Sequence, residues 1–196
     1  MKTVSMLAGA GLLSLALAGL AMAQEAAGGT SAKKAEIGKA APEFDLKDCC
    51  GKAVKLSDYK DKIVVLEWWN NECPWCVKAM PQMKQLNEKY GSKGVVFLGV
   101  DSTAAHKPEG VHKAREDHGV QYPILMDTDG KVGRAYGAKT TPHIFIINKG
   151  TLVYAGAHYE KDGSRDYIAE SLDALLAGKA VPVAETKSYG CSVKYK

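Results

Sequence analysis

Two cysteines separated by two residues, in the segment Cys73-Pro74-Trp75-Cys76, are the side chains of this 196-residue sequence best suited to chemistry. The segment follows an apolar run and opens a helical pattern, so Cys73 is expected at a helix N-terminus. Unpaired N–H groups and the helix dipole favour a thiolate there and lower the pKa of the thiol. Cys76, one turn further on, can close a small disulfide ring. We therefore expect Cys73 to attack a disulfide and Cys76 to resolve the mixed disulfide.

A zinc half-site and an inert structural disulfide are the alternative interpretations of this pair. A tetrahedral zinc site needs a second pair of ligands, and the adjacent pair Cys49-Cys50 is poorly spaced to supply it. The chain has five cysteines, so they cannot all pair within one molecule. The position of the dithiol between a strand pattern and a helix pattern favours the redox interpretation.

The elements that must position the dithiol follow from hydrophobic periodicity. A β-branched and aromatic run over residues 62–69 predicts a central strand buried on both faces, and residues 74–90 predict the helix after it. The further elements expected are an N-terminal hairpin within 41–56, strands at 94–100 and 122–126, helices at 109–118, 127–137 and 165–176, and a hairpin of 144–147 with 151–155. Alternating strands and helices predict an α/β sandwich with a mixed sheet.

The N-terminal residues predict export. A basic start, an uncharged apolar run and the small-x-small pattern Ala21-Met22-Ala23 are typical of a cleaved signal peptide over residues 1–23. An uncleaved anchor is the alternative, which we disfavour because the run is barely long enough to span a bilayer. We expect a flexible linker over residues 24–39, one domain over 40–178 and a C-terminal tail over 179–196. The net charge of +4 comes with scattered basic residues, so nucleic-acid binding has no support.

The sequence resembles the thioredoxin superfamily over most of the chain that follows the predicted signal peptide. The segment from Trp69 to Cys76 is similar to the family's aromatic-x-x-x-Cys-x-x-Cys active site, and Pro81 falls where thioredoxins carry a helix-kinking proline. Thr141-Pro142 resembles the family's cis-proline loop, which packs against the sulfurs and presents backbone to the substrate peptide. The resemblance implies a thioredoxin fold with a central mixed sheet flanked by helices.

Within that superfamily the chain resembles the exported redoxin branch, the alkyl hydroperoxide reductase/thiol-specific antioxidant group, and is similar to cytochrome-maturation thioredoxins. The segments that carry this resemblance are residues 38–44, residues 56–59, the extra element between the strands ending at Val100 and Leu125, and the peroxiredoxin-like ending over 190–196. The resemblance implies an N-terminal hairpin and an insertion in the middle of the fold.

The resemblance also implies roles for further residues. Glu67 matches the buried acid that exchanges protons with the resolving cysteine, and burial would raise its pKa so that it can accept the proton of Cys76. A solvated glutamate at the sheet edge is the alternative. Pro142 is expected beside the sulfurs as part of the catalytic site. The residues expected to line the substrate-binding site are Trp69, Trp75, Thr141 and His143.

Together these features predict an exported, periplasmic thiol–disulfide oxidoreductase with a redox-active Cys73–Cys76 disulfide, antioxidant activity, no cofactor and no resident metal. We expect a reductase rather than an oxidant, kept reduced by a membrane electron donor and acting on exported proteins or small-molecule thiols and disulfides. A copper-binding module of Cys73, Cys76 and His143 is the alternative from another functional class. A peroxidase is disfavoured, because Leu66 and Asn70 stand where peroxiredoxins carry a Pro and a Thr.

Three cysteines remain without an assigned role. Cys49 and Cys50 stand beside a turn, either as two thiols or as a strained and therefore reducible vicinal disulfide. Cys191 either pairs with one of them or serves as an extra redox cysteine. The sequence leaves these alternatives open.

Overall fold

The computed structural model describes residues 34–196. The predicted signal peptide and residues 24–33 of the predicted linker lie outside the described residues. No helix among residues 34–196 is long and apolar enough to cross a membrane. The predicted boundaries between signal, linker, domain and tail stay predictions.

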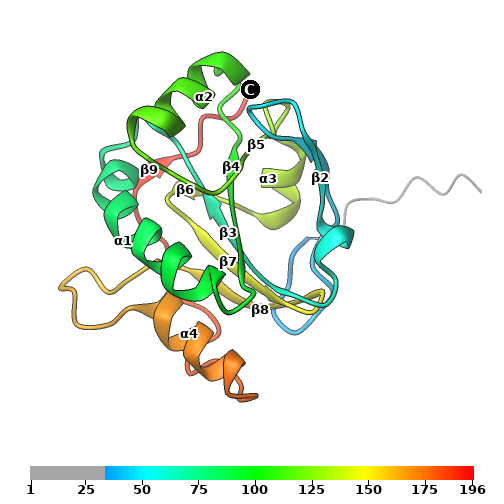
Figure 1. Ribbon diagram of the computed structural model, residues 1–196, viewed down its shortest axis with the longest axis vertical. Helices are drawn as coiled ribbons and strands as arrows, with labels where there is room; N and C mark the ends of the chain where they lie inside the picture. Colours follow the sequence, from blue (N-terminus) through cyan, green and yellow to red (C-terminus); the bar gives the residue numbers. More distant parts are fainter. Residues whose placement is uncertain (1–33) are drawn as a thin grey trace, which may run out of the picture. The chain divides into compact units, whose positions relative to one another are not determined.

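A five-stranded mixed sheet in the order β5-β4-β3-β7-β8 forms the centre of the molecule (Figure 1). β3 pairs in parallel with β4 and antiparallel with β7, so it is the central strand that the sequence predicts. Parallel neighbours need crossover connections, which α1 and the segment containing α2 supply. The bounds are β3 (Ile63–Trp68), α1 (Pro74–Gly91), β4 (Val96–Asp101), α2 (Pro108–Asp117), β5 (Ile124–Met126), β7 (Ile144–Asn148) and β8 (Thr151–Gly156).

Two apolar cores cover the two faces of this sheet, because successive side chains of a strand point to opposite sides. Val65 belongs to the core under α1, α2 and α4 (Tyr167–Leu176), whereas Leu66 belongs to the core on the other face. That second core lies under α3 (Lys131–Tyr136), the N-terminal hairpin of β1 (Asp45–Lys47) and β2 (Ala53–Lys55), and the 3-10 helix η1 (Leu56–Tyr59) (Figure 1). The predicted α/β fold class with its N-terminal hairpin is confirmed.

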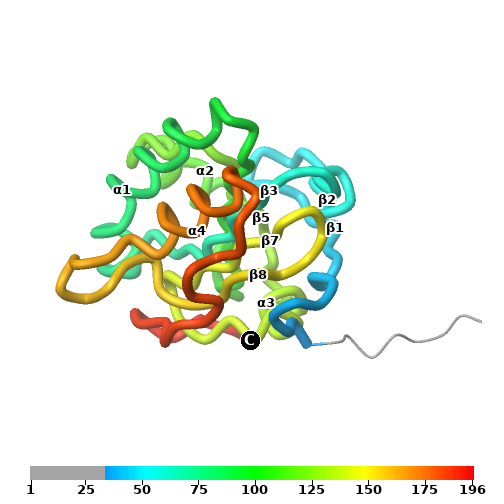
Figure 2. The backbone as a smooth tube through the Cα atoms, turned by 90° about the horizontal axis from the view of Figure 1, so that it is seen from below, coloured from blue at the N-terminus to red at the C-terminus, as the bar shows by residue number. Residues whose placement is uncertain are grey.

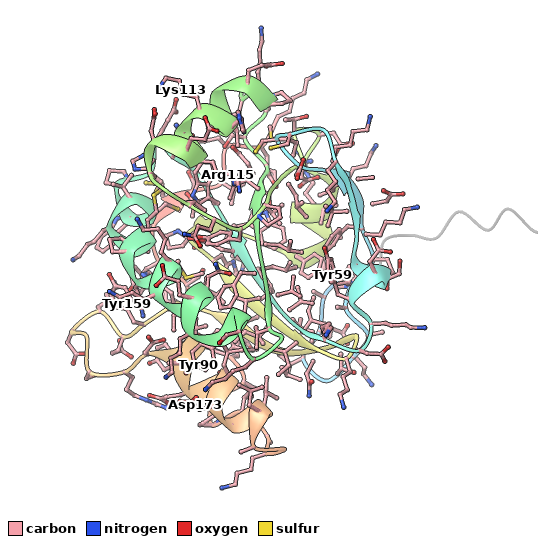
Figure 3. All side chains as sticks on the ribbon, in the orientation of Figure 1. Tyr59, Tyr90, Lys113, Arg115, Tyr159 and Asp173 are labelled. Carbon is pink, nitrogen blue, oxygen red and sulfur yellow. The ribbon has the colours of Figure 1, made fainter. Side chains whose placement is uncertain are left out.

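Helix α1 is fixed against the sheet and against α4. Pro74 stands at its start and Pro81 inside it, and its buried residues recur at helical spacing. The Tyr90 hydroxyl donates a hydrogen bond of 2.9 Å to the Asp173 carboxylate, which joins α1 to α4 (Figure 3). This contact fixes the C-terminal end of α1, opposite the end that carries the dithiol.

Two short strands and one linker contact were not predicted. β6 (Thr140–Thr141) pairs antiparallel with β9 (Cys191–Ser192), so the C-terminal tail is part of the folded body. The tail runs back across the molecule after α4 (Figure 2) and passes β8, where the Ala155 N–H donates to the Ala184 carbonyl. Residues 34–39 also lie against the domain, through hydrogen bonds such as Ala35 N–H to the Ala135 carbonyl.

Candidate active site

Cys73 stands at the N-cap of α1, as the spacing predicts. Its side chain is 3% exposed, and in the thiol form Sγ donates a hydrogen bond of 2.9 Å to the carbonyl oxygen of Thr141. The neighbouring Cys76 thiol lowers the pKa of Cys73 most strongly, and the Cys191 thiol and the Cys76 backbone N–H act in the same direction. Hydrogen bonds to the ionised sulfur favour a thiolate. This environment favours the thiolate form of Cys73.

Cys76 has the opposite environment. It is completely buried inside α1, and burial raises the pKa of its thiol, with the hydrogen bond to Cys73 and the charge of Glu67 acting in the same sense. A buried thiol of high pKa stays protonated at neutral pH and becomes a strong nucleophile only when a base removes its proton. The structure describes both residues as thiols.

Glu67 places a carboxyl group where its charge acts on the Cys76 thiol. It is buried in the central strand β3, so the solvated alternative does not apply. Burial raises its pKa from 4.5 to about 7, while a hydrogen bond donated by the Tyr122 hydroxyl lowers it. A carboxyl group that titrates near pH 7 can both take and return a proton under physiological conditions.

The loop between β6 and β7 closes the site from the other side. The Thr141–Pro142 peptide bond is cis, as the resemblance implies. The Thr141 carbonyl that precedes Pro142 accepts the hydrogen bond of Cys73, so this loop contacts the reactive sulfur. The active-site loop itself is held by Asn70, whose side-chain amide donates to the Thr103 hydroxyl and whose oxygen accepts from the Glu72 N–H.

The two tryptophans expected at the substrate site lie in different environments. Trp75 is 40% exposed at the start of α1, on the surface beside the dithiol. Trp69 is completely buried and belongs to the same apolar core as Cys73 and Cys76. Trp69 therefore supports the dithiol from beneath and presents no surface to a substrate.

His143 does not face the two sulfurs as a ligand. Its Nδ1 accepts a hydrogen bond from the Lys139 N–H, and its ring packs on Phe145 with 4.4 Å between centroids. Burial lowers its pKa to about 4, so it is neutral at physiological pH. It lines a cavity of about 1080 Å³ with Phe145 and Leu152, which none of the cysteines lines.

A different group of side chains has the geometry of a metal site. Among residues 34–196, Cys49, Cys50 and His112 form the one group of three potential ligands whose donor atoms lie within 4.8 Å of one another. The Cys50 sulfur lies 3.4 Å from His112 Nδ1. Within residues 34–196, the alternative copper ligands Cys73, Cys76 and His143 do not form such a group.

The family of the chain follows from comparison with known proteins. The AhpC/TSA family matches residues 37–155, which is more than half of the chain. The chain belongs to the AhpC/TSA family. The thiol-disulfide oxidoreductase ResA of Bacillus thuringiensis subsp. konkukian (strain 97-27) is 36% identical over 120 residues, or 61% of this chain and 68% of ResA.

Solved structures of similar proteins share the fold. An uncharacterized conserved protein from Geobacillus kaustophilus has a TM-score of 0.74 and 32% identity, covering 82% of this chain and 93% of its own. The thioredoxin domain of a thiol-disulfide oxidoreductase from Bacteroides vulgatus has a TM-score of 0.55 and 27% identity, covering 61% of this chain and 87% of its own. The AhpC/TSA family match and the similarity to ResA together show that this chain is a thiol–disulfide oxidoreductase with a thioredoxin fold.

One contributor to the site is not apparent from the sequence, and the sequence leaves the place of another open. Tyr122 lies 55 positions from Glu67 along the chain, and no local pattern links the two. The sequence offers Cys191 either as a partner of Cys49 or Cys50 or as an extra redox cysteine, and its place near Cys73 depends on the pairing of β6 with β9. The one sequence signal for Cys191 is that a cysteine stands in a C-terminal segment without helical or strand periodicity.

Proposed function

We propose that this thiol–disulfide oxidoreductase is exported and reduces disulfides by attack of Cys73, with Cys76 as the resolving thiol and Glu67 as its proton acceptor. The observation that carries the proposal is the different placement of the two thiols: Cys73 stands at the N-cap of α1, whereas Cys76 is completely buried within the helix. The pKa is accordingly lowered for Cys73 and raised for Cys76. The thiolate of Cys73 attacks first and forms a mixed disulfide with the substrate. Glu67 then takes the proton of Cys76, which attacks Cys73 and releases the substrate thiol.

The direction of electron flow depends on two effects of opposite sign. A substrate thiol that attacked a Cys73–Cys76 disulfide would have to expel Cys76, and a thiol of raised pKa leaves slowly. This supports a reductase. The lowered pKa of Cys73 stabilises the reduced form and acts in the oxidising direction. We propose that the effect of the buried Cys76 outweighs the effect of the lowered Cys73 pKa. The reduction potential of the Cys73–Cys76 pair measures which effect is larger.

Substrates and location belong to the same proposal. The exposed ring of Trp75 beside the dithiol fits contact with polypeptide substrates, and Thr141 offers backbone next to the reactive sulfur. We propose exported proteins or small-molecule disulfides as substrates, a membrane protein as electron donor, and the periplasm as location. Mass spectrometry of protein from a periplasmic extract tests the location, with a chain that begins at Gln24 as the expected result and an intact Met1 as the contrary one.

Substrate trapping tests the roles of the two cysteines. In a chain that also carries Cys191→Ser, Cys73→Ser should abolish reduction of insulin disulfides, whereas Cys76→Ser should accumulate mixed disulfides, because no second thiol remains beside Cys73 to release them. Cys50→Ser, which removes an exposed cysteine outside the dithiol, is the matched control and should behave as the unchanged protein. Equal amounts of trapped substrate from the Cys73 and Cys76 variants would contradict the assignment.

A further inference from the structure

The C-terminal tail reaches the reactive sulfur. Strand β9 pairs antiparallel with β6, and the paired residues are Thr140 with Ser192 and Thr141 with Cys191 (Figure 1). Thr141 is also the residue whose carbonyl accepts the hydrogen bond of Cys73. The same residue therefore holds Cys73 through its carbonyl and Cys191 through strand pairing.

Two further observations place Cys191 next to Cys73. The half-buried Cys191 packs against the apolar core that contains Cys73 and Cys76. The thiols of Cys191 and Cys73 also act on each other, since Cys191 lowers the pKa of Cys73 and Cys73 raises the pKa of Cys191. Strand pairing and packing therefore bring Cys191 to the part of the molecule that holds Cys73.

Contacts on both sides of Cys191 fix the tail in this position. Before it, the ring of Tyr189 packs edge-on against Trp75 with 5.4 Å between centroids. After it, the Val193 N–H donates to the Lys139 carbonyl at 3.1 Å. Between them, Gly190 has φ +143 and lies so close to β6 that an added Cβ would be 2.2 Å from the Thr141 carbonyl oxygen. The tail is thus fitted to the loop that contacts Cys73.

The position of β9 matters because β6 has one partner strand among the described residues, and that partner is β9. A polypeptide that brings its own cysteine to Cys73 gains backbone hydrogen bonds if it pairs with a free strand edge. The edge beside Cys73 is β6, and β9 already occupies it. Cys73 is correspondingly 3% exposed, although a reactive cysteine must be reachable.

We propose that Cys191 is a third redox cysteine of this site, which forms a disulfide with Cys73 while β9 occupies the edge on which a polypeptide substrate pairs. The inference deepens the proposed function and rests on it, because it needs Cys73 as the reactive thiol. The tail then acts as a substrate built into the chain, and an external polypeptide must displace β9 to reach Cys73.

The chemical step is a thiol–disulfide exchange at Cys73. Attack of Cys73 on a substrate disulfide leaves a mixed disulfide between Cys73 and the substrate. The Cys191 thiolate attacks the Cys73 sulfur of this mixed disulfide, the Cys73–Cys191 bond forms, and the bond between Cys73 and the substrate breaks with the substrate thiolate as the leaving group. The proton lost by Cys191 ends on the released substrate thiol, and Cys76 is not expelled. The number of disulfides is unchanged, so the step needs no further oxidant or reductant.

The first experiment asks which partner Cys73 chooses. The whole chain with Cys49→Ala, Cys50→Ser and Cys76→Ser keeps Cys73 and Cys191 as its only thiols, and a partner variant also carries Cys191→Ser. Both are incubated at low protein concentration with oxidised glutathione, and intact masses and peptides are measured. We expect a monomer with a Cys73–Cys191 disulfide from the first variant and a glutathione adduct on Cys73 from the second.

The outcomes separate the inference from the proposed function. A glutathione adduct on Cys73 in both variants, with no Cys73–Cys191 peptide pair, overturns the inference and leaves the reactive role of Cys73 intact. No reaction of Cys73 in either variant overturns both.

A second experiment tests whether β9 covers Cys73. In the variant whose only thiol is Cys73, Gly190→Ala should raise the rate of alkylation by iodoacetamide by about tenfold or more, because the added methyl group forces β9 away from Thr141. Gly110→Ala is the matched control, since an added Cβ there meets nothing within 4 Å. An alkylation rate that Gly190→Ala leaves unchanged would overturn the claim that β9 shields the sulfur.

Discussion

The hydroxyl of Tyr122 donates a hydrogen bond of 2.7 Å to Oε2 of Glu67 inside the protein. The second carboxylate oxygen, Oε1, has no hydrogen-bond partner within residues 34–196. One oxygen is therefore held in place while the other is free to exchange a proton. Glu67 thus combines an unpartnered carboxylate oxygen with a pKa of about 7, and its charge raises the pKa of the Cys76 thiol. In the proposed function this carboxylate is the base for the resolving thiol.

The burial of Glu67 predicts a stability cost that depends on pH. Its folded pKa, about 7, lies above its ordinary 4.5, so below pH 4.5 the carboxyl is protonated in both states and costs nothing. As pH rises through 7 the folded protein must hold a buried charge, and the cost reaches about 3 kcal/mol. Glu67→Gln should therefore raise the free energy of unfolding by about 3 kcal/mol more at pH 8 than at pH 4.

Urea unfolding of both proteins at the two pH values measures this difference. Glu88→Gln, which changes an exposed glutamate on α1, is the control and should show no such difference. If Glu67→Gln had the same effect on stability at pH 4 and pH 8, the carboxyl group would have an ordinary pKa and could not serve as the base.

Tyr122→Phe should raise the pKa of Glu67 further, because the hydrogen bond it removes lowers that pKa. A smaller fraction of Glu67 is then ionised at pH 7, so release of substrate from the mixed disulfide with Cys73 should slow at pH 7 and recover at higher pH. The pH dependence of this release measures the change, with Tyr59→Phe on η1 as the control. A midpoint that stays in place or moves to lower pH in Tyr122→Phe would rule out the assigned role of the tyrosine.

Cys73 should hold a thiolate well below the ordinary thiol pKa of 9.0. Ultraviolet absorbance of the thiolate, compared with Cys73→Ser, should show a midpoint below about 7.5. Because the Cys76 thiol contributes most to the lowered pKa, Cys76→Ala should move the midpoint upward, whereas Cys76→Ser retains a hydrogen-bond donor and should move it less. A midpoint near 9 in the unchanged protein contradicts the account of the reactive thiol.

The sequence was enough to predict the central strand, helix α1 and the dithiol between them. These features depend on local patterns: a β-branched run over β3, helical spacing along α1, and a proline at the first turn. The family resemblance implied the burial of Glu67, and its apolar neighbours in the same strand agree with it. Each of these predictions needs only residues that are close along the chain.

The remaining parts of the site depend on contacts between distant segments. Strand β9 is two residues long and pairs with residues some fifty positions away, so no periodicity announces it. Trp69 and His143 were expected at the substrate site, but the packing of the two cores places both side chains in the interior. Which side chains a folded sheet covers is set by the elements packed on it, and local sequence does not specify their exact placement.

The most direct test of the reductase account is the reduction potential of the Cys73–Cys76 pair, with Cys49, Cys50 and Cys191 replaced. Tryptophan fluorescence can follow equilibration with dithiothreitol or glutathione buffers. Trp69 belongs to the same apolar core as the two cysteines, and Trp75 stands between them in the sequence. We predict a value near the thioredoxin end of the scale, roughly −270 mV, which makes the protein a reductant that needs an electron donor. A value near about −120 mV would make it an oxidant and would contradict the proposed direction.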